Sequence, residues 1–225
     1  MVNIVLPREG TRGLATALTV VCALVMTGCA STYYATMERF GIEKRDILVD
    51  RVKDARGEQQ DAQVVFATAL EEFKSVVDFD GGDLEKQYDK LSASYDRANI
   101  QAKDVRGRIK SVEDVGNRLF REWEQELGEY SSASLKAQSE RQLTATRVEF
   151  DGLVKTMNNA AAKMDPVLAL YNDQVLFLKH NLNARAIASL ETEQIEIEER
   201  IEALIEEMNE SIAEADRFIE NMQSA

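Results

Sequence analysis

The regular spacing of apolar side chains is the feature that most restricts what this chain can fold into. Over residues 48–76, and again over 84–123, the apolar positions recur at alternating steps of three and four. This heptad repeat is typical of long helices that pack lengthwise against one another. From residue 29 onward the chain has one proline, Pro166, and eight glycines, so few residues interrupt it. The pattern predicts an all-α fold without strands.

Polar interruptions divide the repeat into segments. Residues 78–83 hold two glycines and end in Asp83, which we expect to cap the next helix. Residues 128–134 form the next interruption. The Asp165-Pro166 pair fits the start of a helix, but the repeat continues past it and predicts a kink or a very short break. Polar residues at 180–185 are a further candidate for an interruption. We expect an elongated antiparallel bundle of three or four long helices with coiled-coil heptad packing.

The N-terminal region has the features of an export signal. Arg8 and Arg12 precede an uncharged stretch of thirteen residues, 14–26. That stretch is shorter than the ~20 apolar residues that span a bilayer, and it has the length of a signal-peptide core. It ends in Met26-Thr27-Gly28-Cys29, which has the pattern of a bacterial lipobox. We expect residues 1–28 to be a lipoprotein signal peptide; an uncleaved membrane anchor is the alternative.

Cleavage before Cys29 would leave this cysteine as the first residue and as the site of lipidation with palmitate. The other cysteine, Cys22, would be removed with the signal, so no thiol would remain for a disulfide or a metal site. Ala30, rather than an aspartate, follows the lipidated cysteine and favours the outer membrane. We expect residues 29–35 to be a lipidated tether and residues 36–225 a single helical-bundle domain facing the periplasm.

The charge of the chain limits its partners. The first 28 residues carry two arginines and one glutamate, so their removal changes the net charge from −13 to −14. This balance argues against nucleic acid, which requires a basic face. Residues 185–225 hold twelve acidic and three basic residues. We expect these glutamates to form a solvated helix face; a docking strip for a basic partner and a divalent-cation site are the alternatives.

Residues suited to catalysis are scarce. His180 is the only histidine, which excludes a multi-histidine zinc site and leaves a nucleophile without a base. The acidic turn at 78–83 lacks the glycine spacing and the distal glutamate of an EF-hand loop. Phe120, Trp123 and Tyr130 are expected to pack in the core at the end of the first hairpin. We predict that the protein is not an enzyme and has neither cofactor nor metal.

One stretch is unusually specific for a helical chain. Residues 166–191 read PVLALYNDQVLFLKHNLNARAIASLE. With the lipobox and the acidic C-terminal helix, this stretch resembles bacterial lipoproteins of the domain-of-unknown-function 2959 family. The resemblance implies a helical, envelope-anchored protein and carries over no catalytic residue or ligand. Its signature is residues 177–185, where the candidate residues for partner docking are Phe177, His180, Asn181, Asn183 and Arg185.

The leading functional hypothesis is a non-enzymatic outer-membrane lipoprotein whose helical bundle is a periplasmic scaffold or tether. Such a protein would contact the membrane through its N-terminal lipid and could self-associate. The alternative is an accessory or regulatory subunit that docks onto an envelope complex through residues 177–185 or through the acidic helix. Cross-linking in the envelope would separate them, since a scaffold gives a ladder of self-adducts and a docking subunit gives a stoichiometric partner.

Overall fold

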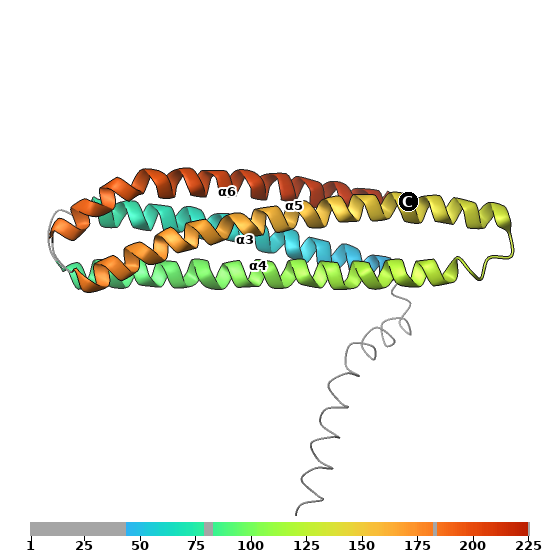
Figure 1. Cartoon of the computed structure of the whole chain (residues 1–225), viewed down its shortest axis with the longest axis horizontal. Coiled ribbons are helices and arrows are strands. Elements are labelled where there is room, and N and C mark those ends of the chain that lie inside the picture. Colours follow the sequence, from blue (N-terminus) through green and yellow to red (C-terminus); the bar gives the residue numbers. More distant parts are fainter. Residues whose placement is uncertain (1–43, 79–82, 182–183, 225) are drawn as a thin grey trace, which may run out of the picture. The chain divides into compact units, whose positions relative to one another are not determined.

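The computed structural model describes residues 44–78, 83–181 and 184–224, except for the side chains of 184–189 and 192. These residues form four long helices and no strand (Figure 1). The helices are α3 (Lys44–Val77), α4 (Leu84–Glu126), α5 (Ala133–His180) and α6 (Ala184–Ser224). The all-α prediction is therefore confirmed, with four helices rather than three. The expected signal peptide and tether lie outside the described residues.

Each helix runs antiparallel to the helices beside it. In the contacts between α3 and α6, the residue numbers increase along one helix while they decrease along the other. The contacts between α4 and α5 show the same order. The pairs between α3 and α6 are Arg56–Asp216, Gln63–Asn209 and Lys74–Glu198. The pairs between α4 and α5 are Arg106–Asp165, Glu113–Asn158 and Glu124–Arg147. The result is an up-down-up-down bundle.

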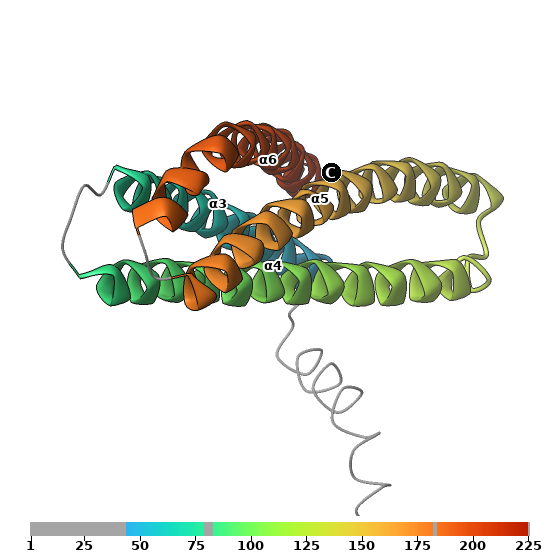
Figure 2. The same ribbon diagram turned by 60° about the vertical axis from the view of Figure 1, so that its left-hand side comes forward.

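The hairpin of α4 and α5 is longer than the other two helices at one end of the bundle. Near this end Glu149 of α5 accepts a hydrogen bond from Asn221, close to the end of α6. Arg45 of α3 donates there to the carbonyl oxygen of Met222. The first turns of α5, from Ala133 onward, extend beyond this level (Figure 1 and Figure 2).

The core follows the predicted heptad positions most closely in α3. All nine positions that the three-and-four spacing predicts for the core of that helix are buried: Leu48, Val52, Ala55, Gln59, Ala62, Phe66, Ala69, Phe73 and Val76. In α4 the middle of the repeat is buried as expected, whereas five positions near its two ends are only half-buried. These five are Leu84, Tyr88, Tyr95, Leu119 and Trp123.

The helix boundaries agree with the polar interruptions, with one exception. Asp83 caps α4 as predicted, accepting hydrogen bonds from the backbone N–H groups of Glu85 and Lys86. Of the two alternatives at Asp165-Pro166, the short break is wrong, because α5 runs through Pro166, and the kink stays a prediction. Proline inside a helix costs one backbone hydrogen bond, about 3 kcal/mol in total. Burial of Met164 and Val167 on either side of it offsets this cost.

Tyr171 of α5 links this helix to α3, which lies diagonally across the bundle. Its ring lies 5.8 Å from that of Phe73, and its hydroxyl donates to the carbonyl oxygen of Ala69 at 3.0 Å. Because the side chain is almost fully buried, desolvation raises the pKa of Tyr171 above its usual value. The hydroxyl therefore stays protonated, as a hydrogen-bond donor must be.

A buried polar pair joins α3 to α6. Gln59 and Ser211 are both fully buried, and the Ser211 hydroxyl donates to Gln59 Oε1 at 3.0 Å. The Gln59 Nε2 atom has no hydrogen-bond partner among the described residues. A buried donor without a partner costs about 1–3 kcal/mol.

Replacing this polar pair with apolar residues is expected to stabilise the bundle. The double variant Gln59→Leu with Ser211→Ala removes the unpaired amide and keeps a similar volume at residue 59. Its free energy of unfolding is expected to rise by about 1 kcal/mol in urea titrations with an unchanged m-value. A fall of similar size would show that the amide is satisfied in solution.

Candidate functional site

The predicted lipidation site cannot be placed, because Cys29 lies outside the described residues. Of the predicted docking residues, Asn183 also lies outside them. Arg185 belongs to the first turn of α6, but its side chain is not described. The structure therefore places three of the five docking candidates: Phe177, His180 and Asn181.

These three residues lie together at the C-terminal end of α5. Phe177 is 41% exposed and His180, the last residue of the helix, is also exposed. Asn181 caps the helix: its backbone N–H donates to the carbonyl oxygen of Leu178 at 3.1 Å, and its Nδ2 donates to that of Phe177 at 3.0 Å. The asparagine thus has a structural role at the helix end, and Phe177 presents an apolar ring to solvent.

The surface between α4 and α5 carries polar pairs at the heptad spacing of the bundle. Glu113 of α4 and Asn158 of α5 are hydrogen-bonded at 2.8 Å across it. Seven residues closer to the end of α5, Arg106 donates to Asp165 at 2.5 Å. The next positions at this spacing are Asn99 with Asn172 and Ser92 with Lys179, which are also polar.

Three partly exposed apolar side chains of α4 and α5 were not recognised in the sequence as candidate site residues: Tyr88, Tyr95 and Leu176. The heptad pattern assigned Tyr88 and Tyr95 to the core, but both are half-buried. Leu176 is 45% exposed and follows buried Val175. The available signal was that nine of the twelve residues at 167–178 are apolar, more than the single apolar stripe that a helix with one buried face needs.

The aromatic cluster predicted near the end of the first hairpin is only partly in the core. Phe120 is buried and its ring contacts that of Phe150, with centroids 5.2 Å apart. Trp123 is half-buried, and its indole N–H donates to Ser139 Oγ at 2.8 Å. Tyr130 is 42% exposed, so the prediction that it packs in the core was wrong. It belongs to the turn after α4 rather than to a helix face.

The glutamates of α6 lie at the surface, as predicted for a solvated face. None of the described glutamates of this helix is buried. Several lie beside basic side chains. Glu198 accepts a hydrogen bond from Lys74 at 2.7 Å. The Oε1 atom of Glu207 lies 3.9 Å from the Nζ atom of Lys163. The hydrogen bond to Glu198 is the main cause that raises the pKa of Lys74. Pairs of this exposed kind contribute little to stability.

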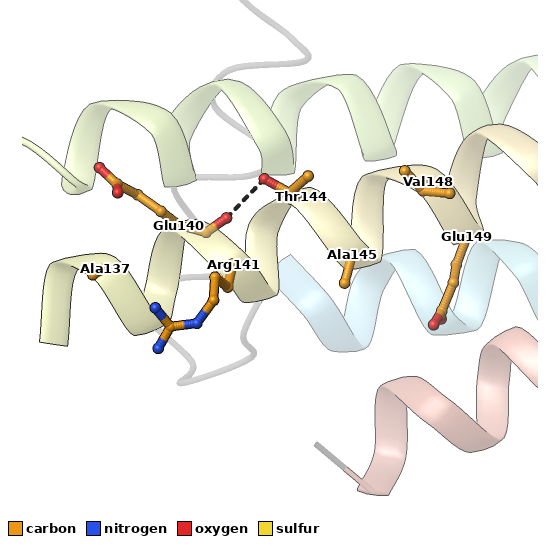
Figure 3. A pocket seen from close by; sticks show the side chains of 7 residues that line it. All are labelled: Ala137, Glu140, Arg141, Thr144, Ala145, Val148 and Glu149. Carbon is orange, nitrogen blue, oxygen red and sulfur yellow. Dashed lines mark hydrogen bonds between the residues drawn. The ribbon is translucent and has the colours of Figure 1, made fainter. Parts of the chain in front are cut away.

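A shallow pocket occurs on the first half of α5, around the level at which α6 ends. Its seven described lining residues all belong to α5 (Figure 3). The Thr144 hydroxyl in this pocket donates to the carbonyl oxygen of Glu140 within the same helix, at 2.8 Å. The lining mixes alanine and Val148 with Glu140, Arg141 and Glu149. Its described side chains offer no nucleophile paired with a base.

The described helices also lack two other kinds of site. No group of three or more potential metal ligands occurs among the residues that the structure describes. Of the helices in that part of the chain, none has a stretch long and apolar enough to cross a membrane.

The fold defines a class of protein, the antiparallel four-helix bundle with long helices. The chain belongs to the family described as protein of unknown function (DUF2959), whose model matches residues 33–222. The match spans all four described helices, which agrees with the family that the stretch at 166–191 indicated. No curated protein and no solved structure matches the chain.

Proposed function

We propose that this protein is a non-enzymatic lipoprotein of the bacterial outer membrane whose bundle is a rigid spacer in the periplasm. One observation carries the proposal: Arg45, near the start of α3, and the exposed ring of Phe177, near the end of α5, lie toward opposite ends of the bundle. Lys74 near the end of α3 contacts Glu198 of α6, whereas Arg45 contacts Met222. The 34 residues of α3 correspond to a length of about 50 Å.

The lipid anchor in this proposal is Cys29, four residues before the start of the family match at residue 33. Anchoring through Cys29 would hold the Arg45 end near the membrane and direct the end of α5 away from it. A multi-chain lipid anchor gains about 0.8 kcal/mol for each buried methylene, enough for stable attachment. The long apolar core would keep the separation constant.

The second candidate, a docking subunit of an envelope complex, is favoured by the exposed apolar residues at the end of α5. Leu176 and Phe177 are 45% and 41% exposed. Phe177 is one of the residues predicted for partner docking, and Leu176 directly precedes it. A spacer that presents a binding surface at its far end combines both functions.

The anchor is tested by replacing Cys29 with serine. The variant is expected to lose labelling by a clickable palmitate analogue and to accumulate as an unprocessed or soluble species. The matched control is Cys22→Ser, which should keep full labelling because residue 22 lies in the predicted signal peptide. Wild-type labelling and membrane fractionation of the Cys29 variant would contradict the proposal.

A further inference from the structure

Three of the four helices contain a residue that weakens a helix in its interior. Gly57 lies inside α3, Gly107 lies inside α4, and Pro166 is the proline inside α5. Glycine lowers helix stability because it loses more conformational freedom on folding, and proline does so because it has no N–H donor. Each of these helices therefore has a weak point away from its ends.

Contacts between α3 and α4 place two of these weak points at one level of the bundle. Glu58, directly after Gly57, accepts a hydrogen bond at 3.3 Å from the Nε atom of Arg108, directly after Gly107. The side-chain amide of Gln101 donates to the same carboxylate at 2.7 Å, so Glu58 lies between these two residues of α4. Gly57 and Gly107 are therefore within about one helical turn of the same level.

Contacts between α4 and α5 place the third weak point at this level as well. Arg106, directly before Gly107, donates a hydrogen bond to Asp165 at 2.5 Å. Asp165 directly precedes Pro166. The weak points of three helices thus lie side by side, and residues next to them are in direct contact.

The packing of the bundle does not require glycine at either of the two positions. A Cβ atom added to Gly57 or to Gly107 would have nothing within 4 Å, whereas one added to Gly116 would meet the ring of Phe150. Alanine would therefore fit at residues 57 and 107, and it favours helices over glycine. At this level the helices are weaker than their packing demands.

The core at the same level contains polar atoms that lack partners. Gln59 is fully buried against Ser211 of α6, and its Nε2 atom has no hydrogen-bond partner among the described residues. The buried Nε atom of Arg56, directly before Gly57, also has none there. Because unpaired buried polar atoms cost free energy, this part of the core stabilises the closed bundle less than an apolar layer would.

Aromatic side chains close the core on both sides of this level. Phe73 and Tyr171 pack together on one side, with ring centroids 5.8 Å apart. On the other side Phe150 packs between Phe120 and Phe218, at 5.2 and 6.2 Å. Interdigitated rings resist a change in the direction of their helices, because close-packed cores deform little. Long arginine side chains, such as those that join the helices between these two clusters, can follow such a change.

We propose that this level is a hinge, at which the helices open together for short times and the bundle bends. We call it the weak layer; it consists of residues 56–59, 106–108 and 165–166 together with Ser211. The hinge goes beyond the spacer function and does not depend on the lipid anchor. A modest bend shortens a long bundle only slightly, so the protein still acts as a spacer while the end that carries Phe177 can move sideways toward a partner.

Hydrogen exchange of the full chain, followed by mass spectrometry, tests whether the weak layer opens as a unit. Gly107→Ala is expected to slow exchange about fivefold in residues 105–111, after correction for intrinsic rates, which corresponds to the helix preference of alanine over glycine. Because the helices of a hinge open together, residues 55–61 and 162–168 should slow by a similar factor. The matched control is Gly152→Ala, which also has nothing within 4 Å of the added Cβ atom but lies outside the weak layer. It should leave all three segments unchanged.

The bend is measured with pairs of spin labels on α5, attached through p-acetylphenylalanine so that no cysteine is needed. Labels at Lys155 and Leu176 span Pro166. Control labels at Arg141 and Ala162 have the same spacing of 21 residues and do not span it; all four positions are exposed. Double electron–electron resonance is expected to give a broader distribution of distances for the spanning pair.

Three results would overturn the proposal. If Gly107→Ala slows exchange only in α4, the helices open independently and the layer is not a hinge. If Gly152→Ala slows the three segments as much as Gly107→Ala does, their exchange requires unfolding of the whole bundle rather than opening of the layer. Equal widths of the two distance distributions would show that the bundle does not bend at Pro166.

Discussion

Replacing Leu204 with aspartate is expected to unfold the bundle or to leave it barely stable. Leu204 is fully buried in α6, and so is Met208 one turn later. Aspartate at this position would leave a charge in the core without a partner and would also remove the leucine contacts. The expected loss is about 4 kcal/mol or more of the free energy of unfolding. Urea unfolding followed by far-ultraviolet circular dichroism measures this loss.

The matched control is Glu206→Gln, two residues further along the same helix. Glu206 is exposed, and glutamates at positions 202 and 210 lie one turn away on either side. Like charges at this spacing repel mildly, so the glutamine variant is expected to be neutral or slightly more stable, within about 0.5 kcal/mol. Unfolding by Glu206→Gln with tolerance of Leu204→Asp would reverse the assignment of the two faces.

The contrast between these two residues could be predicted from the sequence, because the apolar period of α6 is regular over residues 197–208. Leu204 and Ile201 fall on that period and are buried, while the glutamates between them stay at the surface. The same local reasoning predicted the core of α3 and the cap at Asp83. These features depend on residues within a few turns of each other, which a single sequence displays directly.

Features that depend on which helices lie side by side could not be predicted in this way. The period of α4 is as regular at Tyr95 as at Ala98, yet only Ala98 is buried. The period shows that one face is apolar, but not how far the neighbouring helices cover its edge. For Pro166, the local preference for a helix start was overridden because the residues around it pack into the core.

Prediction of the candidate site from the sequence met the same limit. The sequence directed attention to residues 177–185 because of their composition, and the structure places Phe177 and His180 at an exposed helix end. It could not indicate which residues of α4 lie beside the end of α5, because that depends on the register of α4 against α5. This register is set by contacts such as Glu113–Asn158, which join residues 45 positions apart.

A close approach between α4 and α5 gives the second prediction with a large effect. Gly116 of α4 lies beneath the ring of Phe150: a Cβ atom added to it would be 2.2 Å from Phe150 Cζ. Phe150 is itself held between Phe120 and Phe218, whose ring centroids are 5.2 and 6.2 Å away. The ring therefore has little room to move, and Gly116→Ala is expected to cost about 2 kcal/mol through overpacking.

The comparison with Gly107 makes this prediction specific. Gly107 lies in the same helix, and an added Cβ atom there would have nothing within 4 Å. Alanine favours helices over glycine, so Gly107→Ala is expected to raise the free energy of unfolding by about 0.5–1 kcal/mol. The same substitution thus has opposite signs at two positions nine residues apart.

The origin of the Gly116 effect is tested by shrinking its neighbour. Phe150→Leu alone removes core contacts and is expected to destabilise the bundle. In a Phe150→Leu background, Gly116→Ala should cost much less than in the wild type, because the smaller side chain leaves space for the new methyl group. A double-mutant cycle measures this coupling. Additive effects would mean that α4 and α5 are farther apart at this level and that the glycine is not required for their close packing.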